Sequence, residues 1–154
     1  MSIPSKTTSK VKFLAKIINV FQGLKYDHSQ NMGENIEYVV LNIPSDFSLA
    51  EKDALKKAGK GQNLEVLSIF VDEDCFEEVV VSYLNNRKET KTVITLDLRY
   101  GFEFETCVFA TSVDDEYYLV MEANYTLREL LTLKCKDIKE DKSLNAIIRG
   151  LLTR

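Results

Sequence analysis

The chain has 154 residues, of which 45% are hydrophobic and 29% are charged. This composition is typical of one ordinary globular domain and excludes disorder of the whole chain. The formal net charge of -4 disfavours general binding to nucleic acid, because a phosphate backbone repels an acidic surface.

The charge is unevenly distributed along the chain. Five lysines and no acidic residue occur between Met1 and Tyr26, which leaves a net charge of -9 on the remaining residues. We expect these lysines to face water on an N-terminal helix that packs against the domain. The alternative is a basic amphipathic segment that binds a membrane surface or an acidic partner.

The three cysteines, Cys75, Cys107 and Cys135, lie far apart in the sequence, and three cannot all pair within one chain. This predicts a reduced protein in the cytoplasm. No apolar run approaches the roughly 18 residues that a membrane span needs. The most apolar N-terminal stretch is interrupted by Lys16, so a secretory signal is not predicted and the chain is expected to begin near Met1.

The N-terminal region begins with polar residues, and we allow for disorder over residues 1–8. From Val11 to Leu24, apolar residues recur at helical spacing, which predicts an amphipathic helix. Gly23 and the polar residues 27–35 then predict a loop. The next strand is predicted from Ile36 to Ile43, where a proline ends it.

A second helix is predicted from the capping residue Ser48 through Lys57, with Gly59 and Gly61 as its stop signal. The Gly-Lys-Gly sequence here does not predict a phosphate-binding loop. It follows a helix and lacks the Gly-Lys-Ser/Thr ending that grips phosphate and magnesium. The residues Leu64–Val71 are dense in apolar side chains and predict a buried strand.

The stretch VDEDCFEEVV, from Val71 to Val80, places five carboxylates around one cysteine. Acidic residues at this position fit the start of a helix, where free backbone amides and the helix dipole favour negative charge. The apolar residues that follow share one helical face: Phe76, Val79, Val80, Tyr83 and Leu84. Three consecutive valines leave a strand as the alternative for this segment.

Residues 92–125 predict a three-stranded antiparallel meander, because apolar side chains alternate with polar ones. In the first part of this segment the apolar side chains occupy even-numbered positions: Ile94, Leu96, Leu98, Tyr100, Phe102, Phe104, Val108 and Ala110. In the last part they occupy odd-numbered positions: Tyr117, Leu119, Met121, Ala123 and Tyr125. The Arg99–Gly101 segment is predicted as the first turn, which would place Leu98 opposite Phe102.

The second turn of the meander is predicted at Asp114–Asp115, or as a four-residue loop from Val113 to Glu116. Either loop has an even number of residues, which keeps the apolar faces of both strands on one side of the sheet. The expected neighbours are then Val108 with Met121 and Ala110 with Leu119.

The C-terminal region is predicted to supply helices that cover the meander. Thr126 and Glu129 have the spacing of a capping box, and the apolar residues from Leu144 to Leu152 recur at helical spacing. The sequence therefore predicts a single α+β domain over residues 1–154. We expect the meander plus one or two further strands, covered by N-terminal and C-terminal amphipathic helices.

Recognisable reactive chemistry is missing from the sequence. A calcium loop beginning at Asp72 would have Glu77 and Tyr83 where it needs glycine and glutamate. His28 is the only histidine, which argues against zinc constellations and against cysteine catalysis. Glu103 and Glu105 could act as paired acid and base, but a solvated strand face explains them more simply. We predict neither a cofactor nor a metal.

The sequence favours a non-enzymatic cytosolic protein that docks on a basic protein and neutralises or regulates it, in the manner of an inhibitor or immunity protein. Phe109 and Tyr118 fall out of phase with the predicted core, so each is either covered by a second layer or anchors a partner. The residues predicted to bind the partner are Asp72, Glu73, Asp74, Asp114, Asp115, Glu116 and Tyr118. The alternatives are a dimeric chaperone or adaptor and, second, a small enzyme that uses paired carboxylates.

Overall fold

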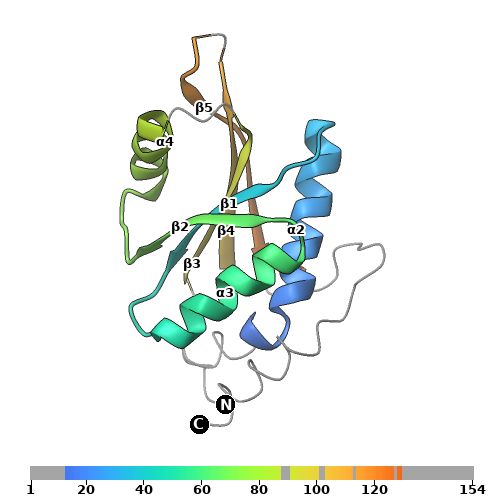
Figure 1. Ribbon diagram of the computed structural model, residues 1–154, viewed down its shortest axis with the longest axis vertical. Coiled ribbons are helices and arrows are strands. Elements are labelled where there is room, and N and C mark those ends of the chain that lie inside the picture. Colours follow the sequence, from blue (N-terminus) through green and yellow to red (C-terminus); the bar gives the residue numbers. More distant parts are fainter. Residues whose placement is uncertain (1–12, 88–90, 101–102, 113, 127, 130–154) are drawn as a thin grey trace.

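A computed structural model describes residues 13–87, 91–100, 103–112, 114–126 and 128–129 (Figure 1). The described helices and strands are α2 (Ile17–Met32), β1 (Tyr38–Ile43), α3 (Leu49–Gly61), β2 (Glu65–Val71), α4 (Phe76–Arg87), β3 (Val93–Tyr100), β4 (Glu103–Thr111) and β5 (Tyr117–Thr126). No helix among these residues is both long and apolar enough to cross a membrane.

The five strands form one mixed sheet in the order β2-β1-β3-β4-β5. β3, β4 and β5 form the predicted antiparallel meander. β1 and β2 are the predicted further strands, but they are parallel to each other and β1 is parallel to β3. The α+β prediction is therefore confirmed, and its sheet is more than an antiparallel meander because two helical crossovers build the parallel part.

Helices cover both faces of the sheet (Figure 1). α2 and α3 pack on one face, in a core that includes Ile94, Leu96 and Val108, as the even-numbered pattern predicts. α4 packs on the other face, over a smaller core that contains Phe109. Phe109 is only 1% exposed, so the second layer, and not a partner, covers this out-of-phase aromatic residue.

α2 is longer than the sequence predicts. The predicted loop over Gly23 and residues 27–35 is wrong up to Met32, because the helix continues to that residue and ends at Gly33, which has a φ of 67°. Leu24 and His28 are fully buried on the same helical face. Burial of this face against the sheet outweighs the poor helix propensity of the glycine and of the polar residues that follow it.

α3 begins at the predicted cap, since Ser48 and Glu51 exchange hydrogen bonds of 3.1 and 2.8 Å with each other's backbone amides. It continues past the predicted end at Lys57 and through Gly59. A Cβ atom at Gly59 would collide with the backbone carbonyl of Leu64, so glycine here allows the helix to approach the start of β2.

The first turn of the meander differs from the prediction. β3 extends to Tyr100, which pairs with Glu103, so the predicted turn Arg99–Gly101 is wrong. The pairing shifts register between Asp97 and Tyr100, and such an irregularity cannot be read from alternation alone. The predicted contact between Leu98 and Phe102 lies outside the described residues.

The second turn contains five residues, 112–116, and a β-bulge compensates for its odd length. Val108 pairs with Met121 as predicted, but Leu119 pairs with Phe109, which leaves Val120 as the extra residue. The predicted pair of Ala110 with Leu119 is therefore wrong, since Ala110 pairs with Tyr118. Tyr117 is turned into the core beneath α4.

The segment from Phe76 is a helix, so the strand alternative is wrong. At the end of β5, Thr126 and Glu129 exchange the hydrogen bonds of the predicted capping box, at 3.0 and 3.1 Å. The C-terminal helix predicted from Leu144 to Leu152, and the disorder allowed for residues 1–8, lie outside the described residues.

Gly59→Ala should destabilise the protein by about 1–2 kcal/mol, because overpacking against the Leu64 carbonyl outweighs the gain in helix propensity. Gly61→Ala is the matched control, since a Cβ atom there meets open space, and it should leave stability unchanged or slightly increased. Chemical denaturation of both variants measures this. Equal effects of the two substitutions would contradict the packing argument.

Burial of His28 makes the fold sensitive to pH. Its Nε2 lies 2.9 Å from Thr106 Oγ1, whereas its buried Nδ1 has no hydrogen-bond partner among the residues that the structure describes. Burial lowers the pKa of His28 below its ordinary value, although the carboxylate of Asp27 opposes that shift. The unfolded chain therefore binds this proton more readily than the folded protein, so stability is lost as the pH falls below about 6.5.

We expect the free energy of unfolding to decrease between pH 7 and pH 5 in the unaltered protein. His28→Gln should show a smaller decrease over the same range, since its amide carries no titrating proton. Denaturation curves at several pH values provide the measurement. Identical pH profiles for the two proteins would show that His28 does not cause the loss.

Candidate functional site

The order in which the chain adds strands to the sheet reverses between β1 and β3. The chain leaves β1 through α3 to reach β2 on one side, and then crosses through α4 to reach β3 on the other side. The two crossover helices lie on opposite faces, as the two core clusters show. In open sheets, ligands commonly bind at such a point, outside the carboxyl ends of the parallel strands.

Asn42 of β1 and Asp97 of β3 are paired residues at this point, and both are buried. The Asn42 side chain is hydrogen-bonded to the loop between β2 and α4. Its Nδ2 donates to the carbonyl of Glu73 at 2.9 Å, and its Oδ1 accepts from the Glu73 amide at 3.1 Å. These two bonds hold the β2–α4 loop over the strand ends.

A cavity of about 280 Å³ remains between the start of α4 and the strands beneath it. The residues that line it are Asp74, Cys75, Phe76, Glu77, Glu78, Thr95, Asp97, Glu105 and Cys107. Five of these side chains are carboxylates, so the cavity has the electrostatic character of a site that repels anions. The sequence singled out Asp74 as a partner residue and Glu105 as one of a possible pair of acids, but it did not predict that they line one cavity with Thr95 and Asp97 of β3.

Three ionisable groups lie close together in this region: Glu77, Cys107 and Glu122. Each contributes one ligand atom, and the three atoms lie within 4.8 Å of one another. The Cys107 thiol donates to Glu77 Oε1 at 3.5 Å. Two carboxylates and a thiol are donors that Zn²⁺ accepts, but exposed acidic groups often gather without an ion, and we assign no metal here.

The thiol of Cys107 is unsuited to nucleophilic chemistry. Burial, together with the negative charge of Glu77, raises the pKa of Cys107 to about 12, so the thiol stays protonated at neutral pH. Cys107 and Cys75 are both free cysteines, Cys107 buried and Cys75 exposed. The cysteine-catalysis reading, which the sequence already disfavours, gains no support from this geometry.

Crowding of acids also affects Glu77. Burial raises the pKa of its carboxyl, the hydrogen bond from Cys107 opposes the shift, and the neighbouring carboxylates of Glu122 and Glu105 add to it. A raised pKa means that the charged form of Glu77 costs stability at neutral pH. Solvent screens much of this cost, because the Glu77 residue as a whole is exposed.

The predicted partner-binding residues fall into two groups that the fold keeps apart. Asp72, Glu73 and Asp74 form the loop before α4, where Glu73 is held by Asn42 and Asp72 Oδ2 accepts from the Ser45 amide at 3.2 Å. Asp114, Asp115 and Glu116 form the turn before β5.

The separation follows from the direction of α4. Its first turn adjoins the loop at Glu73, whereas Asn85 in its last turn accepts a hydrogen bond of 2.9 Å from the amide of Tyr117. The 12 residues of α4 rise about 18 Å between these points. One flat partner surface therefore does not reach both acidic groups without covering α4.

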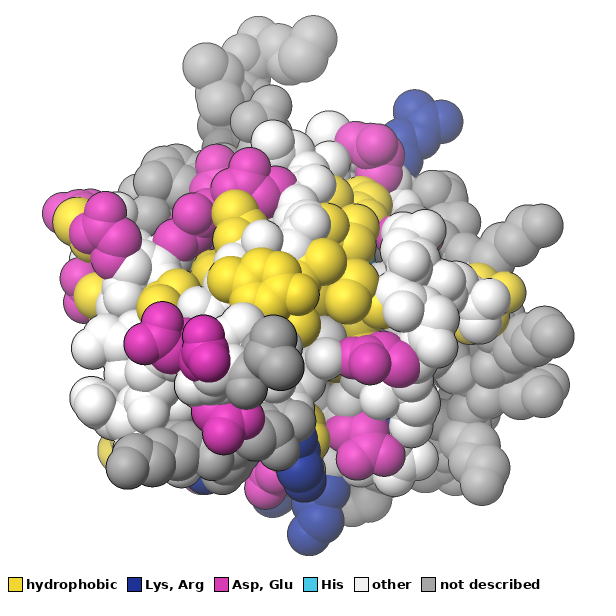
Figure 2. Space-filling view, turned by 90° about the horizontal axis from the view of Figure 1, so that it is seen from above, with side chains coloured by type: hydrophobic (Ala, Val, Ile, Leu, Met, Phe, Trp, Pro, Cys, Tyr) yellow, Lys and Arg dark blue, Asp and Glu magenta, His cyan; other side chains and the backbone are white. Residues whose placement is uncertain are grey.

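The group beside β5 also carries exposed hydrophobic side chains. Tyr118, Leu119 and Val120 are 51%, 39% and 38% exposed, and only the buried Tyr117 separates them from the acidic turn. Viewed toward this end of the molecule, hydrophobic side chains gather in the middle and acidic side chains lie around them (Figure 2). We name Asp114, Asp115, Glu116, Tyr118, Leu119 and Val120 the β5 patch. The sequence identified four of these six residues and missed the last two, because their exposure depends on the bulge.

No model of a known protein family matches the chain. Over 82 residues, or 53% of its length, the chain is 30% identical to the chaperone protein dnaK of Emiliania huxleyi. A match of the same identity and length joins it to the chaperone protein DnaK of Prochlorococcus marinus strain MIT 9515. These matches span only 13% and 12% of the two relatives, which does not assign the chain to their family.

Glu77→Gln should stabilise the protein at pH 7 by about 0.5 kcal/mol, or roughly 1–2 °C in Tm, since it removes one charge from the crowded acids. The amide oxygen can still accept from Cys107. The difference from the unaltered protein should shrink toward pH 4, where Glu77 itself becomes protonated. A Tm difference that does not change with pH would contradict charge repulsion as the cause.

Proposed function

We propose that this chain is a non-enzymatic cytosolic binding protein that docks a basic protein segment through the β5 patch. The observation that carries the proposal is the closeness of three acidic residues to three exposed apolar residues at a strand edge, with only the buried Tyr117 between the two groups. Apolar anchors supply affinity in protein interfaces, and fixed charges supply orientation and partner choice.

The position of β5 suits recognition of an extended segment. β5 pairs with β4 on one side, and among the described residues no strand pairs with its other side. An open strand edge offers backbone donors and acceptors to a segment that adds as a further strand. Main-chain bonds then give affinity, while side chains beside the edge select the sequence.

Charge favours a basic occupant. The acidic turn lies at the beginning of the open edge, and Glu122 and Glu129 add negative charge further along the chain. Lys or Arg residues that flank an apolar segment would be attracted to these carboxylates, and an acidic segment would be repelled. The same charges disfavour close approach of two β5 patches from two copies of this chain.

Local contacts support our choice of the β5 patch over the acidic loop Asp72–Asp74. The loop Asp72–Asp74 is engaged in holding the strand ends, through Asn42 and Ser45, so its negative charge has a local structural role. The β5 patch has no comparable engagement of Tyr118, Leu119 and Val120 with the core, as their exposure shows. We therefore place the docking surface at β5.

Selection of a random peptide display library on the purified chain tests this function. We expect enrichment of extended peptides with Lys or Arg beside β-branched or aromatic residues. Binding of a synthetic enriched peptide should weaken by at least tenfold when Asp114, Asp115 and Glu116 are all replaced by Lys, and when Tyr118 is replaced by Ala. Fluorescence anisotropy at low and high salt measures the affinities.

The matched control is Asp53→Lys, which reverses an exposed charge on α3 and lies outside the β5 patch. It should leave the affinity within about twofold, as expected for a charge distant from the contact. Enrichment of acidic peptides, or binding that survives the triple reversal, would refute the proposal.

A second candidate function is a chaperone or adaptor module that works as a dimer. The observation that favours it is the match over 82 residues to the two chaperone proteins. This candidate predicts self-association in sedimentation and suppression of aggregation of an unfolded test protein regardless of that protein's charge. A monomer that binds only basic segments would exclude it.

A further inference from the structure

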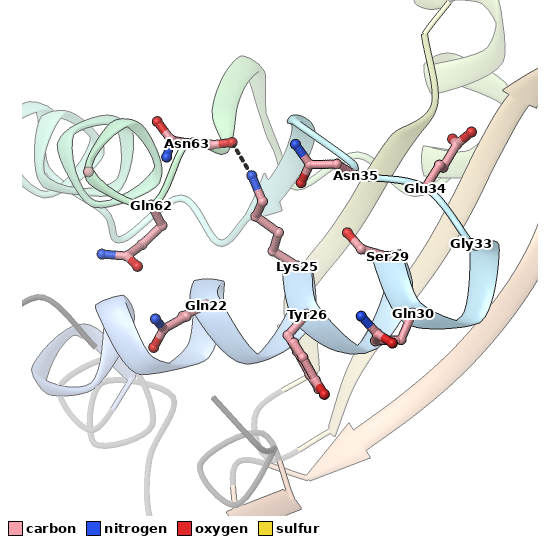
Figure 3. A pocket seen from close by; sticks show the side chains of 11 residues that line it. Gln22, Lys25, Tyr26, Ser29, Gln30, Gly33, Glu34, Asn35, Gln62 and Asn63 are labelled. Carbon is pink, nitrogen blue, oxygen red and sulfur yellow. Dashed lines mark hydrogen bonds between the residues drawn. The ribbon is translucent and has the colours of Figure 1, made fainter. Parts of the chain in front are cut away.

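A polar groove lies between α2 and the turn that joins α3 to β2, away from the β5 patch (Figure 3). Its volume is about 900 Å³. The residues that line it are Gln22, Lys25, Tyr26, Ser29, Gln30, Gly33, Glu34, Asn35, Gly61, Gln62 and Asn63. Nine of them have polar side chains and the other two are glycines, so more of the groove surface is polar than apolar, which favours a polar ligand.

The backbone fixes the walls of this groove. α2 ends at Gly33, whose amide donates to Gln30, and the next amide donates to Ser29. On the opposite wall, Asn63 adopts a left-handed conformation with a φ of 54°, and its amide donates to the carbonyl of Lys60. Both walls are thus closed helix ends, which orders the groove before any ligand binds.

Lys25 joins the two walls. Its ammonium group donates to the carbonyl of Asn63 at 2.7 Å, as the dashed line in Figure 3 shows. Beyond this bridge a second groove of about 780 Å³ continues, and Lys25, Asn35, Gln62 and Asn63 line both. Because the Lys25 ammonium group is hydrogen-bonded to a backbone carbonyl, it holds the two walls together and is less able to neutralise an anionic ligand.

Side-chain carboxamides dominate the remaining groups. The side chains of Gln30 and Gln62 have no hydrogen-bond partner among the described residues. Ser29 Oγ accepts from the Ile36 amide, so its own proton remains available. In Figure 3 the Gln62 side chain points toward Gln22 across the groove, whereas Tyr26 leaves α2 on the side away from Asn63. Carboxamides and hydroxyls each donate and accept hydrogen bonds.

We propose that this groove binds a neutral polyhydroxylated ligand, a saccharide. The hydroxyl groups of a sugar donate and accept as carboxamides do, so neighbouring hydroxyls are matched by the amides of Gln30 and Gln62. The committed Lys25 and the nearby Glu34 disfavour a phosphate or carboxylate ligand. Tyr26 lines the groove but leaves α2 on the side away from Asn63, so its ring does not face the opposite wall and a flat base is not held between the two.

Saturation-transfer NMR with glucose, galactose, N-acetylglucosamine and their short oligomers tests this inference. Saturable binding at millimolar concentration is expected for at least one sugar. Gln62→Ala and Gln30→Ala should each weaken it by about tenfold, as the loss of one or two hydrogen bonds predicts. Asn86→Ala is the matched control, because it removes an exposed carboxamide from α4 on the other face of the sheet.

Inorganic phosphate and adenosine are tested in parallel as charged and flat competitors. Tighter binding of either than of any sugar would overturn the proposal, and so would the absence of saturable binding across the sugars. Equal weakening by Asn86→Ala and Gln62→Ala would place the contact elsewhere and overturn it as well. Thermal unfolding of each variant confirms that the fold is retained, since both glutamines lie at the surface or at a helix end.

Discussion

The fold depends on β1 as a central strand with parallel neighbours on both sides. Five of its six residues are buried, and its side chains reach both cores, with Leu41 facing α2 and α3 and Val40 facing α4. A strand buried on both faces requires helical layers on both faces. The crossover through α4 supplies the second layer and thereby sets the sheet order, the covered aromatic Phe109 and the crevice beside β3.

Asn42 is the exception in this apolar strand. A buried carboxamide is costly unless it is satisfied, and this one forms two hydrogen bonds with the backbone of Glu73. The acids of the loop before α4 therefore have a structural place. These acids are dense in the sequence because the loop both lies over the strand ends and leads into the start of α4.

The proposed functions use different surfaces of one scaffold. The β5 patch lies at the open edge of the meander, where a bulge at Val120 and the turn before it expose apolar side chains beside acids. The polar groove lies between the ends of α2 and α3, where closed helix termini hold carboxamides in place. The sheet positions both the β5 patch and the polar groove, and the fold does not depend on either surface for its stability.

The sequence by itself determined the elements with strong periodicity and clear caps. The alternation over residues 92–125 predicted the meander. Ser48 was correctly predicted as a helix cap and Thr126 with Glu129 as a capping box, because these signals depend on local geometry. The acidic turn and Tyr118 of the β5 patch were also predicted as a candidate partner surface. That function stays a proposal.

Only the tertiary structure decided the features that depend on distant contacts. Helix α2 continues through Gly23 because its buried face packs on the sheet. Glycine is needed at position 59 of α3 because a Cβ atom there would collide with the carbonyl of Leu64. The parallel pairing of β1 and the bulge opposite Phe109 join residues far apart in the sequence, so alternation carries no information about them. The acidic cavity and the polar groove arise in the same way, because each gathers side chains from elements that only folding brings together.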